Sequence, residues 1–330
     1  MRYFARKIGF YAIALWAALT LNFFIPRLMP GNPVDTLMAK LAQRGGSVSP
    51  EARRAYELLL GTDSDEPLWN QYTAYLTNIF RGDLGVSVSA FPTEVSTVIA
   101  QSLPWTVTLV GIATVISFLL GITLGMFAGW KRGTWVDNLI PATTILAAVP
   151  YFWLALLLAA LLAASLGWFP LLGGYDVRTS PAWNWDFLGS AIYHGTLPAL
   201  TIVLSSIGGW MLGMRNMMVS TTSEDFVRTA HAKGLRDGTV MTRYAARNAV
   251  LPSVAAFSVS LGFVVAGSII TEQVFSYPGI GSQLLMAVQN NDYALMQGIF
   301  LVITVAVLGA NLLVDLLYGV IDPRIRAGDR

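Results

Sequence analysis

Few side chains in this sequence belong to types that perform acid–base, nucleophilic or metal chemistry. There is no cysteine, which excludes disulfides and thiolate sites, and the only histidines are His194 and His231. Asp63 and Asp65 form a D-x-D pair, but the adjacent Glu66 favours a solvated acidic loop. Neither a G-x-x-x-x-G-K-[ST] phosphate loop nor an H-E-x-x-H motif is present. The sequence therefore predicts a chain that is not an enzyme and has no catalytic residue, metal site or cofactor of its own.

Polar residues within the mostly apolar runs include Arg215, Glu272, Asn311 and Asp315. Polar groups inside a membrane usually face protein or a solute pathway, because lipid does not solvate them. Asn311 and Asp315 share one helix face, and Arg215 is a candidate partner for Asp315. We expect these residues to form an interhelical clamp; the alternative is that they line a solute pathway. Glu272, near the outer end of its helix, fits either a gate or a hydrated boundary position.

Residues 224–253 form a polar segment that reads EDFVRTAHAKGLRDGTVMTRYAARNAVLPS. Amphipathic stretches at about 224–232 and 238–249 flank Gly234, which permits the left-handed backbone that ends a helix. Pro252 then begins the next apolar run. The pattern predicts a helical elbow that presents a surface to another molecule. The alternative is a basic loop held against anionic lipid headgroups.

The composition indicates a membrane protein. Only 12% of the residues are charged, 55% are hydrophobic, and the mean hydropathy is +0.58. A soluble domain carries about 25% charged residues. Pro141 and Pro150 predict a kink in the apolar segment at about 136–164. The first apolar segment, at about 8–25, is predicted to be a retained membrane helix and not a cleaved signal peptide, since no small-residue cleavage site follows it. We predict an all-α polytopic fold with six transmembrane helices at about 8–25, 104–129, 136–164, 196–219, 251–274 and 293–319.

Basic residues predict the orientation of these helices. With a cytoplasmic N-terminus, 14 of the 21 Lys and Arg residues lie inside, and the outer loops at 165–195 and 275–292 hold only Arg178. Both termini are therefore predicted to be cytoplasmic. The predicted divisions are an N-terminal tail with helix 1 (1–30), a long extracytoplasmic segment (31–103) and a transmembrane core (104–330) that contains the elbow as a loop at 222–250.

Shorter patterns predict local structure. Ser49 and Pro50 are typical of the start of a helix, and residues 67–80 predict a second helix with aromatic residues that either pack on protein or lie at the headgroup level. Gly121, Gly125 and Gly129 recur at every fourth position, which predicts close approach of another helix.

The elbow carries a resemblance to a known family. RTAHAKGL (228–235), followed by Leu-Pro at 251–252, resembles the cytoplasmic EAA loop of permease subunits from bacterial ABC importers, in their dipeptide/oligopeptide/nickel (DppB/OppB-like) branch. His231 stands where that branch usually has Arg, which removes one positive charge. The resemblance covers almost the whole chain, through FRGDLGVS (80–87), TEQVFSYPGIGSQL (271–284) and NLLVDLLYGVIDPRIR (311–326).

The resemblance implies that the elbow is a coupling helix. In this interpretation, an ATPase subunit approaches the elbow closely at Ala230, Ala232 and Gly234. Charged contacts at the rim of that interface are made by Asp225, Arg228 and Lys233. Leu235 completes the implied set.

The implied function is a permease subunit of an ATP-driven importer in the bacterial or archaeal cytoplasmic membrane, with di- or oligopeptides as substrate. Oligosaccharides or a metal chelate are the alternative cargo, and a polytopic membrane enzyme is the alternative class. The implied partners are a second homologous permease subunit, ATPase subunits that bind ATP and Mg, and an extracytoplasmic solute-binding protein that docks on the outer loops. Membrane lipid surrounds the chain, and no nucleic acid is involved.

Overall fold

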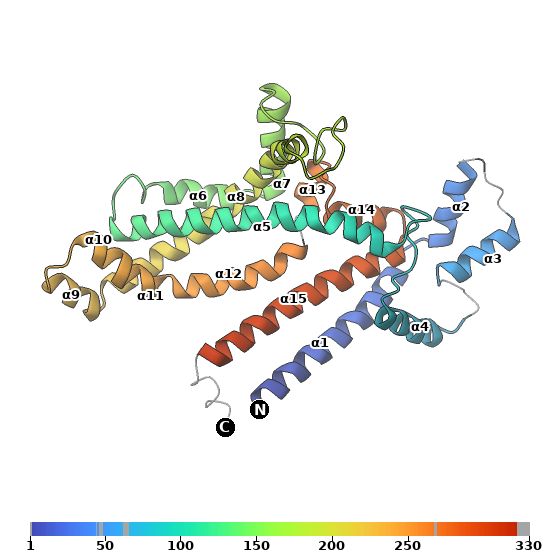
Figure 1. Ribbon diagram of the computed structural model, residues 1–330, viewed down its shortest axis with the longest axis horizontal. Helices are drawn as coiled ribbons and strands as arrows, with labels where there is room; N and C mark the ends of the chain where they lie inside the picture. The colour runs from blue at the N-terminus through green and yellow to red at the C-terminus, as the bar shows by residue number, and fades with distance from the viewer. Residues whose placement is uncertain (1, 44, 46–48, 62–65, 267–268, 322–330) are drawn as a thin grey trace. The chain divides into compact units, whose positions relative to one another are not determined.

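Helices dominate this computed structural model, which describes residues 2–43, 45, 49–61, 66–266 and 269–321 (Figure 1). Within these ranges the chain contains no strand beyond one isolated bridge between Val86 and Glu94. The prediction of an all-α fold is confirmed, whereas the D-x-D pair at Asp63 and Asp65 lies outside the described residues. The chain forms two compact units: Met1–Thr106 with Val265–Ile269 and Pro278–Arg330, and Val107–Val264 with Ile270–Tyr277.

The first unit is built on α1 and α15, which pack side by side (Figure 1). Its core joins the start of α5 to α14 and α15 through Val95, Ile99, Ile280, Leu284 and Ile299. These segments are far apart in the sequence, so only tertiary packing brings them together. Its helices are α1 (Arg2–Arg27), α2 (Pro33–Gln43), α3 (Pro50–Leu59), α4 (Leu68–Arg81), the beginning of α5 (Val95–Trp130), α14 (Ile280–Gln289) and α15 (Tyr293–Ile321).

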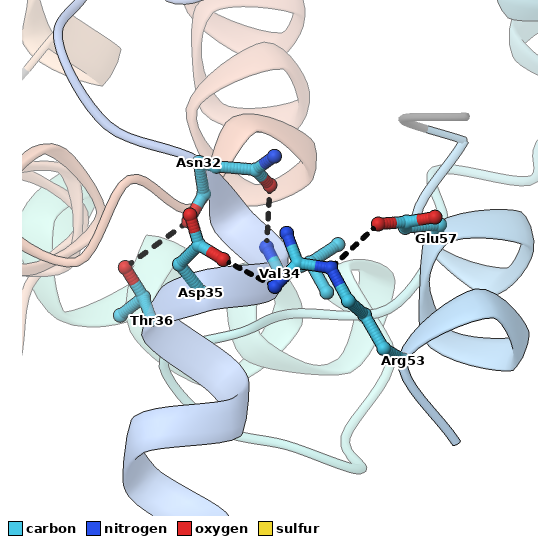
Figure 2. Close-up of polar contacts among 6 residues, drawn as sticks. All are labelled: Asn32, Val34, Asp35, Thr36, Arg53 and Glu57. Carbon is cyan, nitrogen blue, oxygen red and sulfur yellow. Dashed lines mark hydrogen bonds and ion pairs between the residues drawn. The ribbon is translucent and has the colours of Figure 1, made fainter. Parts of the chain in front are cut away.

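Arg53 links helices α2 and α3. The Arg53 guanidinium on α3 lies 2.7 Å from an Asp35 carboxylate oxygen on α2 and 2.9 Å from one of Glu57 on α3 (Figure 2). The two carboxylates raise the pKa of Arg53. The predicted start of α3 is confirmed, because the Ser49 hydroxyl accepts the Ala52 N–H at 3.1 Å.

The helix predicted at 67–80 is α4, and two of its aromatic residues occupy one of the two predicted environments, packing on protein. Tyr72 and Tyr75 pack on Phe23 of α1, with ring centroids 5.3 and 5.5 Å apart. This burial raises the pKa of Tyr75 to about 12. Trp69 and Phe80 remain largely exposed.

The second unit contains the predicted break. Helices α6 (Leu139–Ala148) and α7 (Tyr151–Leu158), the latter continued by the π-helix η1 (Ala159–Ser165), meet at 101°. Pro150 causes the break, since it has no N–H and Val149 before it is extended. Pro141 lies in the first turn of α6 and does not interrupt it. The other helices of this unit are α8 (Trp185–Thr222), α9 (Asp225–Ala232), α10 (Asp237–Thr239), η2 (Val240–Ala246), α11 (Arg247–Ala249), α12 (Leu251–Phe263) and most of α13 (Ile269–Val274), whereas η3 (Val264–Ala266) begins in this unit and continues in the first.

Helix α5 approaches α8 along the predicted glycine ridge. A Cβ placed on Gly121 would lie 2.5 Å from the Cβ of Trp210, and one on Gly129 would lie 2.5 Å from the Cβ of Met218. A Cβ on Gly125 would overlap the Met211 carbonyl oxygen. The prediction of close helix packing is confirmed, because no side chain larger than hydrogen fits at these positions.

Three aromatic rings join α5, α8 and α12 at a second point. Phe118 stacks on Phe257 with centroids 4.1 Å apart and meets the edge of Trp210 at 5.2 Å. The three helices therefore form one packed group within the second unit.

Among the residues that the structure describes, four helices are long and apolar enough to cross a membrane: Arg6–Arg27, Val95–Trp130, Trp185–Thr222 and Tyr293–Leu313. The bent pair α6 and α7–η1 is a candidate for a fifth, and α12 is apolar but shorter. The predicted segment 251–274 is divided among α12, η3 and α13, with residues 267–268 outside the described ranges.

Candidate functional site: the elbow and the intramembrane polar residues

The elbow between α8 and α12 has the predicted local structure. Helix α9 is followed by Gly234 with φ of +72°, and its N–H donates to the His231 carbonyl at 2.9 Å. After this reversal, α10, η2 and α11 form a continuous helical stretch (Figure 1). Pro252 lies in the first turn of α12, as predicted.

The inner face of the elbow is a small apolar core. Val227 and Ala230 on α9 and Val240 on η2 pack with Met214 and Met218 of α8, and all five side chains are buried. This core explains why α9 is helical although it has only eight residues, too few for a stable isolated helix. The elbow is thus attached to α8 by packing as well as by the chain.

The outer face carries most of the residues implied by the resemblance. Asp225, Arg228, Ala232, Lys233 and Gly234 are exposed. Arg228 lies 3.8 Å from Asp225, and both side chains are largely solvated, so this ion pair contributes little stability. The role of these five residues in coupling stays a prediction.

Ala230 requires a correction. We expected it to allow close approach of a partner, but its side chain is only 1% exposed and packs against α8 and η2. Position 230 follows the apolar stripe of α9, three residues after Val227, and this spacing turns it inward. Leu235 is partly buried on the same core. Both residues hold the elbow together.

Trp130, at the end of α5, also reaches the elbow. Its indole N–H donates to an Asp237 carboxylate oxygen at 2.9 Å, and its ring stacks on His231 with centroids 5.9 Å apart. An open groove of about 430 Å³ lies beside it, lined by Lys131, Arg132 and Thr222 among others. The sequence analysis did not single out Trp130; its place directly before two basic residues was the available signal.

The predicted pairing of Arg215 with Asp315 is wrong. The Arg215 Nε lies 3.0 Å from a carboxylate oxygen of Asp137, in the turn between α5 and α6. The same carboxylate accepts the Gly133 N–H at 2.9 Å. These bonds, that from Arg215 above all, lower the pKa of Asp137. The loop after α5 brings Asp137 to α8, a proximity that helix periodicity does not reveal.

Asp315 nevertheless forms the expected interhelical clamp, with different partners. Its Oδ2 accepts from Lys7 Nζ and from the Tyr11 hydroxyl, each at 2.8 Å, and both donors lie on α1. Lys7 and Asp315 are each about one-third exposed. Asn311 is half-buried one turn earlier on α15. The clamp therefore joins the first and last long helices of the first unit.

Neutralising Lys7 alone is expected to destabilise this helix pair more than removing both charges. Lys7→Met leaves the Asp315 carboxylate with an incomplete set of donors, which we expect to cost about 1–3 kcal/mol. Lys7→Met combined with Asp315→Leu should recover at least half of the resulting fall in the melting temperature of the purified protein. Lys131→Met is the control. Additive losses in the double variant would contradict a direct interaction.

Glu272 is fully buried, at 0% exposed, on α13 of the second unit. This overturns the alternative of a hydrated boundary position; its role at a gate stays a prediction. Burial and the nearby Glu272 charge raise the pKa of Tyr277 above its ordinary value.

Asp292 is a buried carboxylate that the sequence analysis missed. It accepts from the Ser87 hydroxyl at 2.6 Å, the Ser89 N–H at 2.7 Å and the Leu295 N–H at 3.0 Å. It thus caps α15 and fixes the loop before α5. The available signal was its place directly before an apolar helix.

Together, several long apolar helices and a polar elbow packed on α8 are typical of a multi-pass α-helical membrane protein. Residues 121–327 match the family described as "Binding-protein-dependent transport system inner membrane component". This chain belongs to that family, and it is a multi-pass inner-membrane component of a transport system.

Its relatives are permease subunits with peptide transport names. The chain is 33% identical to the di/tripeptide transport system permease protein DppB of Pseudomonas aeruginosa, with 99% of each chain covered. It is 32% identical to the dipeptide transport system permease protein DppB of Escherichia coli K12, again over 99% of each. With the oligopeptide transport system permease protein AppB of Bacillus subtilis it shares 30% identity, over 92% of this chain and 93% of the relative.

Proposed function

We propose that this chain forms part of the translocation pathway for di- or oligopeptides in an ATP-driven importer. The observation that carries the proposal is similarity over nearly the full length to di/tripeptide and dipeptide permeases. The exposed outer face of the elbow supports it, because a subunit driven by a soluble motor needs a rigid surface outside the lipid.

The proposed topology has six transmembrane helices and both termini in the cytoplasm. Four long apolar helices and the bent pair supply five spans, and α12 with η3 and α13 supplies the sixth. The bias of basic residues supports the orientation, which leaves the elbow inside and the segment 31–103 outside.

The proposed partners are those that the family resemblance implies. A second homologous permease subunit completes the pathway as a heterodimer, and two ATPase subunits bind ATP and Mg and dock on the elbow. A solute-binding protein delivers the peptide to the outer segment. Leu58 on α3 and Phe80 on α4 are exposed apolar side chains of that segment and suit such a contact.

Site-specific photo-crosslinking in cells tests the partners directly. A photoreactive residue at Ala232 is expected to capture the ATPase subunit, and one at Leu58 the binding protein. Ala230, which is buried, is the matched control for Ala232 and should capture neither. Peptide uptake by the purified chain alone in vesicles, without an ATPase, would overturn the proposal. Uptake of oligosaccharide but not peptide by the complete assembly would overturn the proposed substrate.

A further inference from the structure

Trp130 contacts both arms of the elbow with one side chain. Its N–H binds Asp237 at the start of α10, and its ring stacks on His231 near the end of α9, with the planes 19° apart. Asp237 and His231 lie on opposite sides of the reversal at Gly234. The indole therefore spans the joint of the elbow.

The other helices that meet the elbow are covalently continuous with it. Helix α8 leads into α9 through Ser223 and Glu224, and α11 leads into α12 through Val250. Helix α5 has no such connection and reaches the elbow only through side chains. Among these, Met126 contributes non-directional apolar contact, whereas Trp130 adds an oriented hydrogen bond.

Helix α5 is also packed closely against its neighbours between Phe118 and Gly129. The glycine ridge holds it against α8, and the rings of Phe118, Trp210 and Phe257 join it to both α8 and α12. A displacement passed to the end of α5 would therefore move a packed group of helices. If the contact at Trp130 is lost, α5 and the elbow remain joined by apolar packing, which does not fix their relative direction as an oriented hydrogen bond does.

We propose that Trp130, held by Asp237 and His231, is a positioning residue that makes α5 move with the elbow. This inference rests on the proposed function, because it assumes that the elbow follows an ATPase. The contact of Trp130 with Asp237 and His231 sets how much of the elbow's motion reaches the membrane helices. Its loss lowers the amount of peptide moved for each ATP hydrolysed, while hydrolysis continues.

The test uses the complete importer in proteoliposomes, with peptide uptake and ATP hydrolysis measured on the same samples. Trp130→Phe keeps a ring on His231 but removes the N–H, and Asp237→Leu removes the acceptor. Each is expected to lower the uptake-to-hydrolysis ratio about fivefold, as expected for loss of one hydrogen bond that couples two moving parts. The double variant should lose no more than either single variant, since both break the same bond.

Two further variants separate coupling from folding. Asp237→Asn keeps a carbonyl acceptor and should restore at least half of the ratio lost in Asp237→Leu. Trp135→Phe is the control, because Trp135 is 72% exposed in the loop after α5. If Asp237→Leu does not assemble, Trp130→Phe alone decides the question.

The outcomes distinguish the proposed role of Trp130 from the proposed function of the chain. An unchanged uptake-to-hydrolysis ratio in Trp130→Phe, or additive losses in the double variant, overturns the proposed role of Trp130, provided that a photoreactive residue in place of Ala232 still crosslinks to the ATPase. If a photoreactive residue in place of Ala232 fails to capture the ATPase in a chain with no other substitution, the proposed function itself is overturned.

Discussion

Gly125→Leu is expected to abolish accumulation of folded protein in the membrane. Even a Cβ at this position would overlap the Met211 carbonyl oxygen and come within 2.9 Å of the Met214 Cβ. The obstacle includes backbone, so it cannot be relieved by a rotamer change, and α5 would have to move away from α8. Such overpacking costs at least about 3 kcal/mol, a large part of the stability of a typical domain.

A matched pair of alanine variants isolates the steric cause. Gly125→Ala and Gly209→Ala make the same chemical change within a helix, but a Cβ on Gly209 meets no atom within 4 Å. Alanine favours helix by about 1 kcal/mol over glycine, so Gly209→Ala should be neutral or stabilising. The measurement is the fraction that remains monodisperse by size exclusion in detergent after heating. Equal behaviour of the two variants would contradict the packing described for α5 and α8.

Gly234→Pro is expected to leave the importer assembled but to reduce peptide uptake at least about tenfold, while ATP hydrolysis continues. The φ of +72° at Gly234 is inaccessible to proline, and its N–H to His231 would be lost. The turn between α9 and α10 must then change direction, which misplaces the outer face of the elbow. Uptake and hydrolysis measured in proteoliposomes check the result.

Two controls distinguish conformation from bulk at this turn. Space is available, since no atom lies within 4 Å of a Cβ on Gly234. Gly234→Asn, which tolerates a left-handed backbone, should therefore retain most uptake, whereas Gly234→Val should not. Gly238→Ala, within α10, should behave as the unmodified protein. Equal uptake by the Asn and Val variants would show that the left-handed turn is unimportant for coupling.

Local signals predicted the elements of this fold well. The break at Pro150, the cap at Ser49 and the reversal at Gly234 each depend on the backbone preferences of one residue. Such preferences act over a few neighbours and are therefore readable in the chain itself. For the same reason, the predicted bounds of the two helical arms of the elbow agree with the observed bounds to within a few residues.

The partners of the charged residues were not predictable in this way. Asp315 was expected to meet Arg215, but it binds Lys7, 308 positions away, while Arg215 binds Asp137. Apolar helices of similar composition offer many equivalent pairings, so residue type and helix face cannot select one of them. Ala230 is a different case, because its spacing from Val227 indicates the buried face of α9, whereas the family motif by itself does not state which face is buried.

The sequence by itself determined a polytopic helical membrane protein, its apolar segments, its elbow and its family resemblance, because hydrophobic length and backbone limits are properties of contiguous residues. The tertiary structure alone decided that α1 and α15 share a salt bridge, that Asp292 holds the loop before α5, and that Trp130 spans the elbow. These contacts join residues far apart in the chain. They depend on how the helices pack, and packing is set by the fit of many side chains together.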